Sequence, residues 1–565
     1  MIDFRLYRVA LIPAVAAFVM MMFSLEGVPE PPDPQIAPAI FDSDRMRDNL
    51  RQVLDAAPER SPGSSGDEAV ANLVLDRFDA VAAGTAATQS FEATVSGEDR
   101  QLRNVILTLP GESDRTLLVT AARDSASGPG AASSAAATAA LIELAEALGG
   151  TEHLKTLVLV STTAGTQGAE GALRFLEGYR ERDLVEAAVV LVQPGAAEPQ
   201  PPHVLRHSTD DRSTSMQLVR IAEKALAERT SREPAERGLF SSLARLALPL
   251  AAGEQSVLIE QGIDAVGISS AGERPLPPSE DTEEGLDRNV LAEFGAAALG
   301  TILILDPLRA PLEHGPDSYV EFSGSLVPGW AVAVFSLALL LPVAVAAFDG
   351  VARAARRRAG IVRALAWAFG LALPLVGVLA AIHLLGLIGL LATPAFPFDP
   401  GRFSVGIGEA LVLALLAGLG VAGFLLGGLA RAPERPWPEA LVPALGSAAV
   451  AGALGVWLLN PYLALLLAPA AHLWLLAARE APRPRPLMAA GVAVAILPAL
   501  LATRSSAAAI GAGPWDLLLA TAGGQVSAPI LLALCPLAGS LAGLLFLMRA
   551  PRLERTDDRG AREGT

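Results

Sequence analysis

Long apolar runs constrain this chain of 565 residues more than any other feature of its sequence. One run covers Val9–Phe23, and the others lie at about 326–348, 364–391, 405–429, 440–458, 462–478, 487–502 and 527–548. A helix of 23 residues is roughly 34 Å long, which is enough to cross a hydrocarbon layer of ~30 Å. The sequence therefore predicts eight membrane spans, of which 487–502 is the shortest, and an interfacial segment at 515–526.

The first run is expected to be an uncleaved anchor. Arg5 and Arg8 precede it, and a proline-rich stretch follows from Pro29 to Pro38. A removed signal peptide is the alternative, but the residues directly after the run lack a small-x-small cleavage pattern.

The arginines predict how the chain crosses the membrane. Only Arg402 and Arg504 lie in the loops after the third, fifth and seventh spans. The segments after the second, fourth, sixth and eighth spans hold many more: Arg353, Arg356, Arg357, Arg358, Arg363, Arg431, Arg435, Arg479, Arg483, Arg485, Arg549, Arg552 and Arg555. Basic loops favour the cytoplasmic side. We therefore expect a multi-pass protein of the cell membrane with both termini in the cytoplasm. Its predicted parts are an anchor at 1–25, an extracytoplasmic domain at 26–322, a seven-helix membrane domain at 323–548 and a tail at 549–565.

Composition excludes several classes of function. The net charge of −16 argues against a nucleic-acid partner, because phosphate binding needs a basic face. Cys535 is the single cysteine and lies in a predicted membrane helix. An intrachain disulfide is therefore excluded, and a cysteine-based metal site or nucleophile is disfavoured.

Between the apolar ends, β-rich and amphipathic segments alternate. The strand candidates are Leu102–Leu109, Thr116–Ala121, Thr156–Thr162, Ala187–Gln193 and Asp264–Ser269, and the helix candidates are Asp67–Ala83, Ser133–Leu148, Ala169–Tyr179 and Ser215–Glu228. Such alternation is typical of an α/β domain with a largely parallel sheet and helices on both faces. The predicted fold class is thus an outer αβα sandwich followed by an all-α membrane bundle.

The order of motifs in this domain resembles that of the zinc aminopeptidases of metallopeptidase family M28, over nearly all of residues 43–305. The matching stretches are Arg60-Ser61-Pro62-Gly63-Ser64, Arg103-Asn104-Val105-Ile106, Asp124-Ser125, Gly128-Pro129-Gly130-Ala131, Leu141-Ile142-Glu143-Leu144-Ala145, Gly168 with Gly171 and Phe175, Gly262-Ile263, and Asp281-Thr282. The resemblance implies a mostly parallel mixed sheet with a two-zinc site. In that site histidines and carboxylates hold the metals, and a glutamate serves as general base.

This chain departs from the family at every one of those positions. The metal-ligand and base positions fall on Ala122, Ser133, Gly165, Thr166, Gln193 and Pro277. A complete zinc site contributes on the order of 10–16 kcal/mol, so losing all of its ligands leaves no site to weaken. The resemblance therefore implies a pseudo-peptidase, which binds no cofactor.

Other polar residues fall near the expected cleft and are candidate substitutes for the missing ligands. Asp124 is expected to be solvated or locally hydrogen-bonded, and Ser133-Ser134 to cap a helix rather than supply a nucleophile. Gln167 and Glu170 fall close to the lost carboxylates, and Glu280 with Asp281 is expected in a turn on the cleft rim. His203 and His207, followed by Asp210 and Asp211, have a metal-like spacing, but Pro201-Pro202 precede them and argue against a helix.

Three polar residues fall inside the predicted spans, where such groups usually have partners: His383, Glu409 and His472. His383 and Glu409 are placed in the outer halves of adjacent spans, so they could pair or meet a lipid headgroup. Glu409 lies near the end of its span, and simple extension to the interface is equally compatible with its position.

The plan of anchor, outer peptidase-like domain and seven-helix bundle is similar to that of the large membrane subunit of the eukaryotic GPI transamidase. The resulting hypothesis is a non-catalytic membrane protein that binds or presents a peptide, a lipid-linked substrate or a membrane-protein partner. An active membrane-bound zinc aminopeptidase with unorthodox ligands is the alternative. A transporter-like bundle is a third reading, but no repeat or charged midplane cluster supports it.

Overall fold

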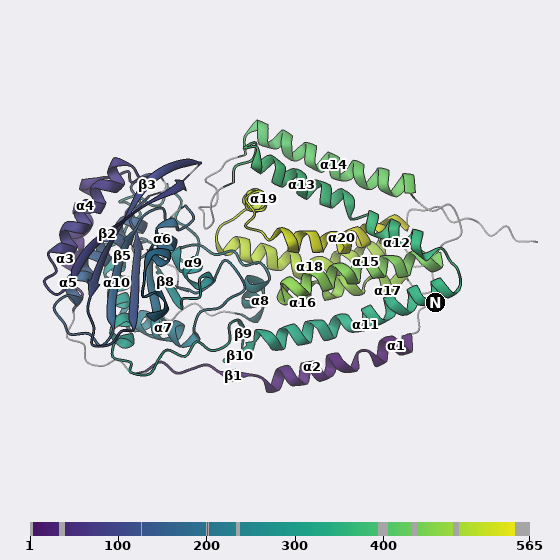
Figure 1. Cartoon of the computed structure of the whole chain (residues 1–565), viewed down its shortest axis with the longest axis horizontal. Coiled ribbons are helices and arrows are strands. Elements are labelled where there is room, and N and C mark those ends of the chain that lie inside the picture. Colours follow the sequence, from purple (N-terminus) through teal and green to yellow (C-terminus); the bar gives the residue numbers. More distant parts are fainter. Residues whose placement is uncertain are drawn as a thin grey trace, which may run out of the picture.

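The computed structural model describes residues 4–32, 40–95, 97–125, 127–165, 167–198, 201, 203–232, 238–393, 405–431, 438–477 and 485–547. A sheet domain and a bundle of long helices lie end to end along the longest axis (Figure 1). Side chains at 427–431, 438–439, 485 and 547 are not described.

The sheet domain is built on seven strands. These are β2 (Thr85–Val95), β3 (Glu98–Leu109), β4 (Thr116–Ala122), β5 (Thr156–Thr162), β6 (Val185–Gln193), β7 (His203–Leu205) and β8 (Ala265–Ser269), in the spatial order β2-β3-β5-β4-β6-β8-β7. The four central strands β5, β4, β6 and β8 are parallel, as predicted. The remaining pairs, towards the two edges, are antiparallel, so the sheet is mixed, as the resemblance implies.

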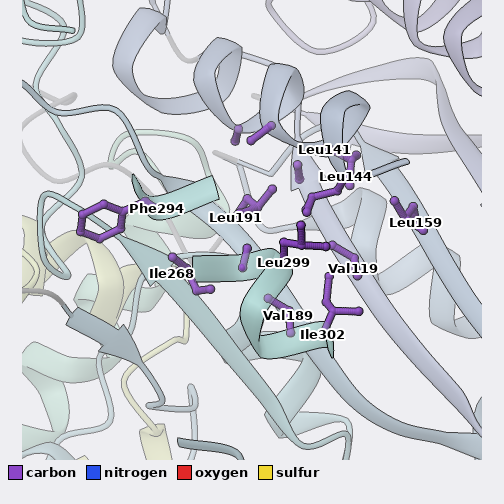
Figure 2. Packing of buried hydrophobic residues seen from close by; sticks show 14 of the residues in the cluster. Val119, Leu141, Leu144, Leu159, Val189, Leu191, Ile268, Phe294, Leu299 and Ile302 are labelled. Atoms are coloured by element: carbon purple, nitrogen blue, oxygen red, sulfur yellow. The ribbon is translucent and has the colours of Figure 1, made fainter. Parts of the chain in front are cut away.

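Helices cover both faces of this sheet, which confirms the αβα sandwich. They are α3 (Ser43–Ala56), α4 (Ser65–Asp79), α5 (Ala136–Leu148), α6 (Glu170–Gly178), α7 (Met216–Thr230), α9 (Glu254–Glu260) and α10 (Arg288–Leu305). Helices α3, α4, α5, α7 and α10 share one core with the sheet, and α6 and α9 share the core of the opposite face. Figure 2 shows strand residues Val119 and Val189 beside Leu144 of α5 and Leu299 of α10.

Helices α5 and α10 are apolar and 18 residues long, counting the π-helical turn Ala131–Ala135 before α5, but they do not belong to the bundle. In the most apolar stretch of each, 83% and 61% of the residues are buried. Their hydrophobicity is therefore explained by burial against the sheet and neighbouring helices.

The bundle contains the remaining long apolar helices. Its elements are α1 (Phe4–Val9), α2 (Ile12–Phe23), α11 (Gly329–Arg356), α12 (Ile361–Gly370), α13 (Leu373–Leu387), α14 (Ile407–Arg431), α15 (Pro438–Leu459), α16 (Pro461–His472), α17 (Trp474–Ala477), α18 (Arg485–Ala509), α19 (Pro514–Ala522) and α20 (Ala528–Leu547). Within the described residues, seven helical segments of the bundle are long and apolar enough to cross a membrane, and Pro461–Ala477 is a shorter apolar one.

These segments correspond to the eight predicted spans, with changes in detail. The span expected at 364–391 is divided into α12 and α13 next to Pro374, because proline removes a backbone donor and disrupts the helix. The span expected to be shortest, 487–502, is in fact α18, with 25 residues. Only α19, with nine residues, forms a helix in the segment expected at the interface.

The two parts meet through α8 (Leu239–Ala247) and a small sheet of β1 (Glu26–Gly27), β9 (Tyr319–Phe322) and β10 (Ser325–Pro328). Ala244 and Leu246 of α8 belong to one buried cluster with residues of α11, α16 and α18. The sheet domain and the bundle therefore share an apolar contact.

Candidate ligand-binding cleft

One cavity gathers four of the six positions at which the sequence is expected to have lost the ligands and base of the family. It is lined by Ala122 at the end of β4, Ser133 in the turn before α5, Gly165 after β5 and Gln193 at the end of β6. Its volume is about 100 Å³. Because β4, β5 and β6 are parallel, their carboxyl ends meet at one edge, where α/β folds bind ligands. Pro277 lines a neighbouring cavity, and Thr166 lies outside the described residues.

Two of these positions offer a metal no donor atom. Ala122 is an alanine, and Gly165 has no side chain at all. A Cβ built on Gly165 would lie 2.3 Å from the Cβ of Ala122 and 3.2 Å from Oε1 of Glu254. A side chain at Gly165 therefore has no room, at a position where the resemblance implies a carboxylate.

Gly165→Ala should therefore destabilise the sheet domain. Overpacking of this kind costs about 1–3 kcal/mol, which lowers the midpoint of thermal unfolding by several degrees. Gly150→Ala is the matched control, because a Cβ at Gly150 meets nothing within 4 Å. Equal midpoints for the two variants would show that the loop after β5 can move away from Ala122.

Ser133 is hydrogen-bonded to Asp281 through both its side chain and its backbone. Its hydroxyl donates to Oδ2 of Asp281, and Oδ1 accepts from the backbone N–H groups of Ala132 (2.9 Å) and Ser133 (3.0 Å). Burial raises the pKa of Asp281, and these hydrogen bonds reduce that increase. Asp281 ends the predicted turn, with its N–H donating to the carbonyl of Pro277 at 3.0 Å, and its side chain is buried in the cavity wall.

The prediction that Ser133-Ser134 caps a helix is wrong. Both residues lie inside the π-helical turn Ala131–Ala135, and α5 begins only at Ala136. Asp281, far away in sequence, supplies the acceptor for the free amides of this turn. Ser134 instead accepts a hydrogen bond from Arg60.

Arg60 is a buried positive charge beside the cavity. It is fully buried, and its guanidinium donates to the carbonyls of Ala57, Arg123 and Pro129 as well as to Oγ of Ser134. Burial lowers the pKa of Arg60 to about 10, although nearby carboxylates oppose the shift. Arg60 therefore holds the turn before α5 through these hydrogen bonds, and it remains protonated at neutral pH.

The side chains of Asp124 and Gln193 hold loops beside the cavity through hydrogen bonds to backbone groups. Oδ1 of the buried Asp124 accepts from the N–H of Gly165 at 2.8 Å. Nε2 of Gln193 donates to the carbonyl of Arg274 at 2.8 Å, and its Oε1 accepts from the N–H of Leu276 at 3.0 Å. Gln193 thus holds the loop at 272–276 over the cavity.

Glu254 is a buried cavity residue that was not predicted from the sequence, and Glu273, partly buried on the same lining, was not predicted either. Glu254 begins α9, is buried, and accepts hydrogen bonds from the hydroxyls of Thr120 (2.9 Å) and Thr162. Burial raises its pKa to about 7, and the two threonine hydroxyls limit the increase. The available signal was a pair of threonines inside apolar strands, which indicates a buried polar partner.

The other substitutes lie elsewhere. Gln167 and Glu170 are half-buried but do not line the cavity, and Glu170 lies 3.7 Å from Arg174. Glu280 is exposed and, with His203, lines the neighbouring cavity. Nε2 of His207 lies 3.7 Å from Oε1 of Glu273.

The residues present do not fit a zinc pair. The side chains around the cavity are all engaged in hydrogen bonds within the protein: Ser133, Gln193 and the carboxylates of Asp124, Glu254, Glu273 and Asp281. Across the described parts of the chain, no group of three or more histidine, cysteine, aspartate or glutamate side chains is arranged to hold a metal ion. Zinc needs at least three such ligands in a catalytic site.

The three polar residues of the predicted spans do not form one cluster, because His472 is separated from Glu409. His472 bonds to the carbonyl of Ala468 in its own helix and lies edge-to-face with Tyr7 of α1, at 6.0 Å. Glu409 folds back on the first turn of α14, where its Oε2 is near Gly406. The start of α14 and α1 lie at opposite ends of the bundle (Figure 1).

Sequence comparison finds known proteins that are similar to part of the sheet domain. Residues 104–301 match the sequence model of Peptidase family M28. Transferrin receptor protein 1 of Gallus gallus is 37% identical over 92 residues, which are 15% of this chain and 12% of that receptor.

Solved structures with a similar fold cover about half of this chain. A zinc aminopeptidase from Bacillus subtilis is 13% identical, with 47% of this chain and 95% of the other covered and a TM-score of 0.39. A leucine aminopeptidase precursor from Bacteroides thetaiotaomicron is 17% identical (49% and 99% covered, TM-score 0.38), and a glutaminyl cyclase from the same organism is 16% identical (49% and 99%, TM-score 0.39). Segment 104–301 of the sheet domain is therefore similar to Peptidase family M28, and the same chain carries a bundle of long apolar helices.

Proposed function

We propose that this protein is a membrane-embedded pseudo-peptidase, which binds a peptide or a partner segment outside the membrane and does not cleave it. The observation that carries the proposal is the closure of the cleft around Gly165, which leaves no room for a ligand side chain. Four family positions hold groups that bind no metal, and the cavity between them persists. It is lined by serines, apolar groups and three carboxylates, which suits a small polar or peptidic group.

The membrane placement is part of this proposal. The connection between α11 and α12, which carries several arginines, lies at the end of the bundle away from the sheet domain, as does the N-terminus (Figure 1). Because basic loops stay in the cytoplasm, this arrangement supports a multi-pass protein with cytoplasmic termini and residues 26–322 outside. Membrane lipid and a membrane-protein partner are then the expected neighbours, as in the accessory subunit of the GPI transamidase that the architecture resembles.

Catalysis is tested on the full chain in lipid nanodiscs. After equilibration with zinc and removal of free metal, we expect less than one bound zinc per chain and no release of chromophore from aminoacyl p-nitroanilides. Stoichiometric zinc with chelator-sensitive release would establish the alternative, an active aminopeptidase with unorthodox ligands.

Binding is tested with fluorescent short peptides whose amino ends are free or acetylated. Ser127 is exposed on the cavity lining, so Ser127→Trp should block entry and weaken binding at least tenfold. Ser90→Trp, on the exposed surface of β2, is the matched control and should bind as the unchanged chain does. Equal binding by both variants would place the peptide elsewhere.

A further inference from the structure

Helix α8 shows two different surfaces. Its second half is buried, including Ala244, Arg245 and Leu246. Its first turn is exposed, with 47% of Leu239 and 41% of Phe240 accessible. Adjacent large apolar side chains exposed at one helix end are costly in water, and they mark a surface that something apolar covers.

Hydrogen bonds fix the level of α8 along the bundle. The hydroxyl of Ser506 donates to the carbonyl of Ala244 at 2.8 Å, and Nδ2 of Asn460 donates to the carbonyl of Leu246 at 2.8 Å. Ser506 lies in the last turn of α18, and Asn460 is the N-cap of α16. Helix α8 therefore lies at the level where α18 ends and α16 begins.

Two residues of the bundle indicate that this level is the membrane interface. Arg504 of α18 is exposed two residues before Ser506, and Trp330, the second residue of α11, is 53% exposed. An exposed arginine is expensive within the hydrocarbon layer, and tryptophan concentrates where headgroups meet acyl chains. The first turn of α8 thus lies at headgroup depth.

We propose that α8 is an interfacial helix, and that Leu239 and Phe240 insert into the adjacent phospholipid leaflet. Lipid is the occupant because the exposed turn is continuous with the apolar flank of the bundle: Leu243 packs at the edge of the cluster that also includes Met21 and Leu25 at the end of α2. This inference rests on the proposed membrane placement of the bundle. It adds that the outer domain itself binds the lipid surface.

The insertion has a consequence for the cleft. Arg245, on the same helix, pairs with Glu273, which lines the cavity described above. The rim of the cleft is then tied to a helix held at the lipid surface. Ligands would reach it at a fixed height above the membrane.

Spin labelling measures the depth directly. Cys535→Ser removes the single cysteine, and one label is then placed at Phe240 (Phe240→Cys) in vesicles of phosphatidylcholine and phosphatidylglycerol. Labels at Ile40, 78% exposed on the sheet domain, and at Leu419, 53% exposed in the middle of α14, are the aqueous and lipid controls. The ratio of collision with oxygen to collision with a water-soluble nickel chelate reports depth.

We expect the ratio at position 240 to be several-fold higher than at position 40 and below that at position 419. A ratio equal to that at position 40 would overturn the proposal. A label shielded from both reagents would also overturn it, because a protein surface would then cover the helix. Zinc content and peptide binding are measured separately, so failure here leaves the pseudo-peptidase proposal to its own test.

Discussion

Arg245→Met is expected to destabilise the junction between the sheet domain and the bundle by about 3–5 kcal/mol, as the breaking of a buried ion pair does. Arg245 is 4% exposed, and its guanidinium pairs with Oε2 of Glu273 and donates to the carbonyl of Ser506 at 3.2 Å. Burial lowers the pKa of Arg245, and the charge of Glu273 opposes that shift. Removing the arginine leaves a largely buried carboxylate without its main partner.

The measurement is the thermal unfolding midpoint of the full chain in nanodiscs, together with hydrogen exchange over 272–276. The single variant should unfold several degrees lower and exchange faster in that loop, because Glu273 no longer holds it to α8. Arg245→Met combined with Glu273→Leu should recover most of the loss, since an apolar pair of similar volume replaces a buried ion pair at little cost. Unchanged unfolding and exchange in the single variant would show that the pair contributes nothing.

Much of the fold could be predicted because its signals are local. Each of the five predicted strands is present, since apolar runs such as Leu117–Val119 are typical of buried parallel strands. Strand β2 was missed because it is an edge strand with mostly accessible residues, so its pattern is largely polar. Helix α9 was missed because Glu254, Gln255 and Ser256 are buried through specific partners, which hides its apolar face.

In the bundle, too, some features follow from the local sequence and others from contacts between distant residues. Length and hydropathy predict the segments, because a membrane fixes how long a span must be. The break between α12 and α13 is also local, since Pro374 stands beside it. The junction through α8 is not, because the partners of Ala244 and Leu246 are Ser506 and Asn460, more than 200 residues away (separations of 262 and 214).

The candidate cleft was predictable where it follows the order of motifs. Ala122, Ser133, Gly165 and Gln193 were placed by position along the sequence, and the structure brings them around one cavity. What replaces the lost ligands could not be placed in this way. Glu254 bonds to Thr120 across 134 residues, and Asp281 caps the turn at Ser133 across 148 residues. Such contacts arise from tertiary packing, on which no local pattern reports.

Glu254→Gln is expected to stabilise the sheet domain at alkaline pH and to leave it unchanged in acid. Burial raises the folded pKa of Glu254 from 4.5 to about 7. A carboxyl with a raised pKa contributes stability that is fully present below the unfolded pKa and is lost as pH rises through the folded pKa. The shift corresponds to about 3 kcal/mol lost between pH 4.5 and 7, at 1.36 kcal/mol per unit.

Glutamine has nearly the same shape and never ionises, so the variant lacks this loss. The hydroxyls of Thr120 and Thr162 can rotate, and one can accept from the new amide while the other donates to its oxygen. Unfolding midpoints at about pH 5 and pH 8 test the sign, with Glu280→Gln, at an exposed position, as the matched control expected to follow the unchanged chain. If Glu254→Gln also follows it at both pH values, Glu254 is ionised throughout. If instead the variant gains stability only at pH 8, the cavity holds a carboxyl that is half protonated near neutrality and can accept or donate a hydrogen bond to a bound peptide.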